Sequence, residues 1–154
     1  DKTLSNDLQV GAIHLMFPKA VILHSQRAPE DALLASYRKL FLTGNDMSYD
    51  LDDLVTFIRD RKALMRHWEA VLPGRVIPVS NEALIADPEA QIRRLLDICG
   101  LSWEPKCLEF FRTRRPVRTA SAYQVRRPLN TEGVGRWRLY EAHLADAISA
   151  LNAP

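Results

Sequence analysis

The sequence predicts an α/β fold built on a parallel sheet. Two short runs, at 20–25 and 75–80, are apolar and rich in branched side chains, which is typical of strands buried in a parallel sheet. Helical patterns separate these runs, and strands joined through helices pair in parallel by a right-handed crossover. Pro78 favours an edge position for the second strand, because proline donates no ladder hydrogen bond. Two strands make a thin sheet, so we expect the rest of a doubly wound sheet to lie upstream of Asp1.

Apolar side chains at helical spacing fill most of the remaining chain. Asp50 and Asp87 are suited to cap two of the helices, and Gly100 is suited to end the second. The predicted helices run from 4 to 17, from Pro29 to about Leu42, from 51 to 72, from 88 to 99, for a short stretch after Pro105, and from about 137 to 151.

Several apolar residues are assigned to the inner faces of these helices. Leu15 and Met16 belong to the apolar spacing of the first helix, and Tyr37 and Leu40 are expected to face inward on the second. Cys99 is expected on the buried face of the helix that begins after Asp87.

Composition limits the classes of protein to which the chain can belong. It is 47% hydrophobic and 26% charged, which suits one globular domain over residues 1–154. No apolar run is long enough to predict a membrane span, and no signal peptide opens the chain, which begins at Asp1 instead of Met. Two cysteines are too few for a disulfide framework and fit no common zinc spacing, so we expect free or buried thiols and a cytoplasmic location. The four histidines are scattered, and we expect no metal.

Positive charge is concentrated near the C-terminus. Residues 112–138 contain eight arginines and one acid, Glu132, for a net charge of +7, whereas the remainder of the chain sums to −5. Residues 113–136 show no clear period and are predicted to form an ordered loop that contains Gly133 and Gly135. A local excess of this kind indicates an anionic ligand or partner. The alternative is a solvated basic loop that binds nothing.

Arg27 follows the first predicted strand and precedes the helix that begins at Pro29. Ligands of open α/β sheets bind at the carboxyl ends of strands. A phosphate there would meet both a guanidinium and a helix N-terminus. The alternative is that Arg27 forms an ion pair with Glu30 or Asp31.

Three blocks of the sequence carry a resemblance to a known family, together with Asp1-Lys2 followed by Asn6 near the start. They are FPKAVILHSQRAPEDALLASY at 17–37, LPGRVIPVSNEALIADPEAQIRRLLDICGLSWEP at 72–105 and RRPVRTASAYQVRRPLNTEGVGRWRLYEAHL at 114–144. The chain resembles the sulfotransferase superfamily, most closely its bacterial branch that is often fused to tetratricopeptide repeats and is related to tyrosylprotein sulfotransferases. The resemblance implies a three-layer, P-loop-type sulfotransferase fold with a parallel sheet, of which this chain is the C-terminal part.

The resemblance also implies a cofactor, 3′-phosphoadenosine-5′-phosphosulfate (PAPS), and residues that bind it. Arg27 matches the arginine that binds the 3′-phosphate. The serine eight residues further on is Ala35 here, and its neighbour Ser36 would need a shifted register to serve. A position that is often aromatic in the family holds Asn81. Contacts to the nucleotide are further assigned to Ser121, to Gln124, Val125, Arg126, Arg127 and Pro128 in a loop that closes over the cofactor, and to Arg136.

The catalytic machinery is only partly matched. Lys2 aligns with a family lysine that lines the active site and could stabilise charge on the transferred group, although a lysine near a terminus is more often a surface residue. The loop that grips the 5′-phosphosulfate has no match in this chain, and the general base is expected upstream of Asp1. We therefore expect these 154 residues alone to be inactive.

The implied reaction is transfer of a sulfuryl group from PAPS to a hydroxyl or amine acceptor, such as a protein tyrosine, a glycan or a small molecule. Tetratricopeptide repeats in the same full-length chain are a further expected partner. A second hypothesis is a degenerate module that binds a nucleotide or a partner without chemistry. Nucleic-acid binding is not expected, because the arginine-rich segment lacks interleaved aromatic residues and a helix-turn-helix signal.

Overall fold

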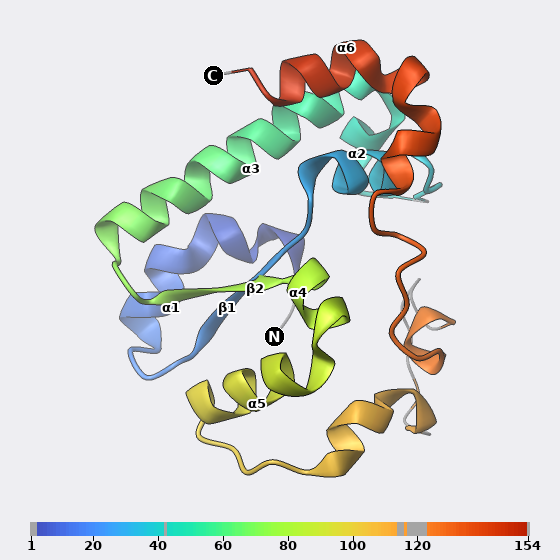
Figure 1. Ribbon diagram of the computed structural model, residues 1–154. Helices are drawn as coiled ribbons and strands as arrows, with labels where there is room; N and C mark the ends of the chain where they lie inside the picture. Colours follow the sequence, from blue (N-terminus) through green and yellow to red (C-terminus); the bar gives the residue numbers. More distant parts are fainter. Residues whose placement is uncertain (1–2, 42, 114–115, 117–122, 154) are drawn as a thin grey trace.

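Two parallel strands lie at the centre of the computed structural model, which describes residues 3–41, 43–113, 116 and 123–153 (Figure 1). Strand β1 (Ile22–Gln26) pairs with β2 (Val76–Ser80), with Ile22 opposite Val76 and Gln26 opposite Ser80. The parallel pairing was predicted from the sequence. Because the strands run in the same direction in this register, their carboxyl ends meet at one edge of the sheet.

Helices make up most of the described chain, which is mixed α/β and predominantly helical. Figure 1 shows α1 and α3 toward one side of the strands and α4 and α5 toward the other. The helices, with η denoting 3₁₀ geometry, are η1 (Leu4–Gln9), α1 (Val10–Met16), α2 (Pro29–Tyr37), η2 (Asp46–Tyr49), α3 (Leu51–Val71), α4 (Asn81–Ala86), α5 (Pro88–Ile98), η3 (Pro105–Arg112), η4 (Gln124–Arg126), η5 (Arg136–Tyr140) and α6 (Glu141–Leu151). None of the helices in the described part of the chain has the length and apolar character needed to cross a bilayer.

The predicted capping residues are confirmed. The Asp50 carboxylate accepts hydrogen bonds from the backbone N–H groups of Asp52 and Asp53 at 2.8 and 3.1 Å, and so begins α3. Asp87 accepts from the N–H of Ala90 at 3.1 Å at the start of α5. These bonds satisfy donors that the first turn of a helix leaves unpaired.

Most of the buried apolar residues in the described part of the chain gather in two clusters. One joins α2, α3 and α6 and contains Leu33, Leu54, Val55, Ala147 and Leu151. The other joins α1, α3 and β2 through Val10, Met65 and Val76, with Ile22 packed against it. The first cluster fixes α2, and the second fixes the beginning of β1, against the long helix α3.

Several boundaries and inner faces differ from the prediction. Helix α2 ends at Tyr37 instead of Leu42, because packing stops after Leu33 and Leu34 while Tyr37 and Leu40 are exposed. The first predicted helix begins as a 3₁₀ turn, and its Leu15 and Met16 are 81% and 70% exposed, since α1 enters the core through Val10.

Two further differences concern the segment after β2. Helix α4 was not predicted; its N-cap Ser80 accepts a hydrogen bond from the N–H of Ala83 at 3.1 Å. Cys99 is exposed instead of buried, because it is the C-cap residue of α5. Cys99 and Cys107 are both free thiols.

Candidate functional site

Arg27 joins the carboxyl end of β1 to the C-terminal arginine-rich segment. It lies between β1 and α2, and its Nη2 donates a hydrogen bond to the carbonyl oxygen of Gly133 at 2.5 Å, across 106 residues of sequence. Its Nε is buried and has no hydrogen-bond partner among the described residues. A buried donor without a partner is costly, so this nitrogen is a candidate contact for an anion.

Gly133 is the residue that permits this approach. A Cβ at that position would lie 2.7 Å from Arg27 Nη2, which is closer than real Cβ atoms come to a neighbour. A side chain at residue 133 would require the Arg27 guanidinium, the end of a flexible side chain, to move away, so glycine permits the contact as it is.

Asp31 makes a second connection between the same two regions. This residue of the first turn of α2 is only 2% exposed. One carboxylate oxygen accepts from the N–H of Gly135 at 2.6 Å, and the other accepts from the N–H of Trp137 at 3.2 Å. The alternative in which Asp31 forms an ion pair with Arg27 is therefore not what the described residues adopt.

Glu82 ties the ends of the two strands together. Its carboxylate accepts from the N–H of Ala28, just beyond β1, at 2.9 Å and from the Ser80 hydroxyl, at the end of β2, at 3.1 Å. Burial alone would raise the pKa of Glu82, but hydrogen bonds from the N–H of Ala28, its own N–H and the Ser80 hydroxyl, with the charge of Arg27, lower it below the ordinary 4.5. Glu82 is thus held as a carboxylate beside Arg27.

The sequence prediction did not identify Asp31 or Glu82 as parts of the site. Asp31 was considered only as an ion-pair partner. A signal for Glu82 was present, since a carboxylate directly after the second strand must lie near the end of the first when the two strands are parallel.

The structure does not bring every predicted site residue to Arg27. Ser36 is half-buried in the last turn of α2, nine residues beyond Arg27, while Ala35 is exposed. Ser36 forms no hydrogen bond with Arg27 in the part of the chain that the structure describes, and Ala35 has no polar side-chain group to form one. Lys2 and Ser121 lie outside the described residues.

The predicted closing loop, residues 124–128, packs elsewhere. Helix η4, which contains Gln124, Val125 and Arg126, contacts η3. Pro128, with Leu129, lines an apolar hollow of about 250 Å³ that is completed by Pro88, Ile92, Leu108, Phe110 and Phe111. The predicted closing loop therefore has neighbours different from those of segment 133–137, whose Gly133, Gly135 and Trp137 form hydrogen bonds with Arg27 and Asp31 beyond the end of β1.

Two arginines of this loop differ in their surroundings. Arg127 forms an exposed ion pair with Glu132 at 2.8 Å, and that hydrogen bond raises the pKa of its guanidinium. Arg136 begins η5, and its side chain is exposed. It lies between Gly135 and Trp137, the two residues whose backbone N–H groups Asp31 binds.

No metal centre is formed by the described residues, among which no three or more His, Cys, Asp or Glu side chains gather closely enough to hold an ion. What the site offers instead is one half-buried guanidinium, an exposed arginine nearby and the N-terminus of α2. Guanidinium groups and helix N-termini both favour phosphate or sulfate groups.

Comparison with known proteins gives two findings. A family model described as "Sulfotransferase family" matches residues 1–105. An uncharacterised protein of Aquifex aeolicus (strain VF5) is 36% identical over 154 residues, which is 98% of this chain and 20% of the relative. The chain therefore spans about a fifth of the length of that relative, and the family match includes β1, α2 and β2 but not the arginine-rich segment.

Proposed function

Because the chain belongs to the sulfotransferase family, we propose that it binds the nucleotide of PAPS in an enzyme that sulfates a hydroxyl or amine acceptor. The observation that carries the proposal is the hydrogen bond from Arg27 to Gly133, which places the arginine-rich segment at the carboxyl end of β1. That edge is where ligands of open α/β sheets bind.

The residues at this edge fit the 3′-phosphate of the nucleotide. Arg27 has a buried Nε without a hydrogen-bond partner among the described residues, and α2 begins two residues after it, at Pro29. Arg136 adds a second guanidinium on the neighbouring segment. We propose that these two arginines neutralise the phosphates, and that Ser36, Ser121 and residues 124–128 make further contacts when the nucleotide binds.

Sulfuryl transfer makes demands like those of phosphoryl transfer: an acceptor attacks in line while charge builds on the leaving nucleotide. PAPS supplies the sulfuryl group in this reaction. The role proposed for this chain is to orient the nucleotide and stabilise charge on it, with Lys2 as a candidate near the transferred group. The general base and the rest of the three-layer sheet are proposed to come from residues outside these 154, and tetratricopeptide repeats and a cytoplasmic location remain predictions.

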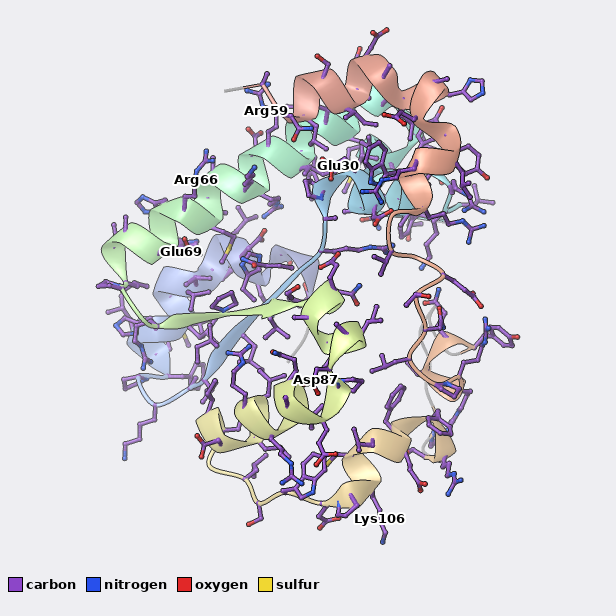
Figure 2. The ribbon with its side chains drawn as sticks, in the orientation of Figure 1. Glu30, Arg59, Arg66, Glu69, Asp87 and Lys106 are labelled. Atoms are coloured by element: carbon purple, nitrogen blue, oxygen red, sulfur yellow. The ribbon has the colours of Figure 1, made fainter. Side chains whose placement is uncertain are left out.

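The test is a calorimetric titration of the full-length protein with 3′-phosphoadenosine-5′-phosphate (PAP), followed by transfer of labelled sulfate from PAPS to a panel of tyrosine peptides, glycans and phenols. We expect PAP to bind, and Arg27→Ala to weaken binding about 10- to 100-fold, since a hydrogen bond to a charged group contributes about 1.5–3 kcal/mol. The control Arg66→Ala removes an equal charge from the outer side of α3, away from the strand ends (Figure 2), and should leave affinity unchanged.

The same experiment separates the two candidate functions. PAP binding with sulfate transfer supports the enzyme. PAP binding without transfer to any acceptor favours the non-catalytic module, for which Ala35 at the family's serine position is the supporting observation. No PAP binding, or equal loss in Arg27→Ala and Arg66→Ala, contradicts the nucleotide assignment.

A further inference from the structure

We propose that Asp31 is a positioning residue that holds segment 133–137 at the end of β1 before the nucleotide binds. This inference rests on the proposed function, because the segment matters only if it contributes to the phosphate site. It goes further by assigning a role in binding to a buried carboxylate that itself touches no ligand.

The burial of Asp31 requires the partners it has. A carboxylate that is 2% exposed cannot be solvated by bulk water, so it must be paired or hydrogen bonded. No salt bridge to Asp31 is present among the described residues, and its two oxygens are bound by the N–H groups of Gly135 and Trp137. These donors lie 104 and 106 residues away in sequence, so the bonds hold a distant segment in place and do not shape α2 itself.

The two bonds fix the position of Arg136. Gly135 precedes it and Trp137 follows it, and both N–H groups point to one carboxylate. The Arg27 bond to Gly133 holds the same segment two residues earlier. The backbone of Arg136 is therefore anchored on both sides, at a fixed place relative to Arg27. The two amide N–H groups take the place of water around the Asp31 carboxylate, which keeps its negative charge.

Preassembly of this kind lowers the cost of ordering the loop when the nucleotide binds. If the anchored arrangement is the only one that binds and its population falls to about a tenth, the apparent dissociation constant rises about tenfold. In Asp31→Asn one amide oxygen can still accept from one N–H, but the NH₂ group then faces the other N–H. The variant keeps the size of the side chain and loses the paired acceptor.

Glu30 provides a matched control. It is the other acid in the first turn of α2, so Glu30→Gln removes the same charge from the same helix N-terminus. Its carboxylate accepts a hydrogen bond from the Asn152 side chain at 3.3 Å, and in the described structure it forms no hydrogen bond or ion pair with residues 133–137.

The experiment measures backbone amide hydrogen exchange and PAP affinity on the full-length protein and its two variants. In the wild type without nucleotide, the amides of Gly135 and Trp137 should already be protected. In Asp31→Asn both amides should exchange at least tenfold faster, the PAP dissociation constant and the KM for PAPS should rise about tenfold, and kcat should change little. Protection of the core amide of Leu33 reports that the fold is retained, and Glu30→Gln should match the wild type throughout.

The outcomes are distinguishable. Unprotected amides at Gly135 and Trp137 in the nucleotide-free wild type overturn the proposal without any mutation, which covers the case in which Asp31→Asn does not fold. Unchanged PAP affinity in a folded Asp31→Asn also overturns it. If the wild type itself binds no PAP, the proposed function fails. If the wild type binds PAP and Asp31→Asn binds it with the same affinity, only the role of Asp31 is rejected.

Discussion

The close approach of Gly133 to Arg27 gives a quantitative prediction for Gly133→Ala. The new Cβ would lie 2.7 Å from Arg27 Nη2, and the next nearest atoms, Cζ and Nη1 at 3.6 and 4.0 Å, belong to the same side chain. The backbone of Gly133 does not have positive φ, so alanine is not excluded by its backbone conformation. The substitution should therefore act through Arg27 alone.

Two opposing contributions set the magnitude. Displacing the guanidinium breaks the bond to the Gly133 carbonyl, which contributes about 1.5 kcal/mol at the low end for a charged donor, appropriate for a half-buried arginine. Replacing glycine by alanine stabilises the folded state by about 0.4–1 kcal/mol through the unfolded chain. Gly133→Ala should thus lower the free energy of unfolding by about 0.5–1 kcal/mol in the wild-type background.

The assay is a double-mutant cycle with Arg27→Ala, measured by urea unfolding. Without the Arg27 side chain the new methyl group meets nothing within 4 Å, so Gly133→Ala should be neutral or stabilising there, and the coupling energy should be about 1.5 kcal/mol. Equal effects of Gly133→Ala in both backgrounds would refute the claim that Gly133 is needed for contact with Arg27.

Three further predictions follow from other contacts. Glu82→Gln should lower the free energy of unfolding above about pH 4.5, and this difference from the wild type should vanish as the pH falls through the lower pKa of Glu82 in the folded protein. Urea unfolding between pH 3 and pH 7 measures the difference. A difference that does not change with pH contradicts the prediction. Asp50→Ala should cost about 1 kcal/mol by urea unfolding, whereas Asp60→Ala, at an exposed position inside α3, should cost less; equal losses would argue against the cap. Arg127→Ala should weaken PAP binding in calorimetry less than Arg27→Ala does, because Arg127 is paired with Glu132; the reverse order would show that this ion pair opens to receive the nucleotide.

Elements with strong local signals were predictable from the sequence. A few adjacent residues determine strands β1 and β2, which are short apolar runs, and the starts of α3 and α5, which are capped by aspartates. Helix α4 was missed because its start depends on the hydroxyl of Ser80, which is itself the last residue of β2. The early end of α2 was missed because Tyr37 has the same apolar character as Leu34, and only tertiary packing distinguishes them.

The candidate site shows the same division. Arg27 was identifiable from its place after a strand and from the family resemblance, and the arginine-rich segment from its charge. The roles of Asp31 and Glu82 depend on partners 104 and 54 residues away, respectively, which no local pattern contains. The difference between the predicted closing loop and segment 133–137, with Pro128 against η3 and Gly133 against Arg27, likewise arises only from the folded arrangement.

Nuclear magnetic resonance of the ¹⁵N-labelled full-length protein, titrated with PAP, examines most directly whether the end of β1 and segment 133–137 form one anion site. The account predicts that the Arg27 Nε–H signal and the backbone amides of residues 133–137 shift together, along one binding curve. Shifts confined to other parts of the chain, or shifts at Arg27 and at 133–137 with different binding curves, would contradict it.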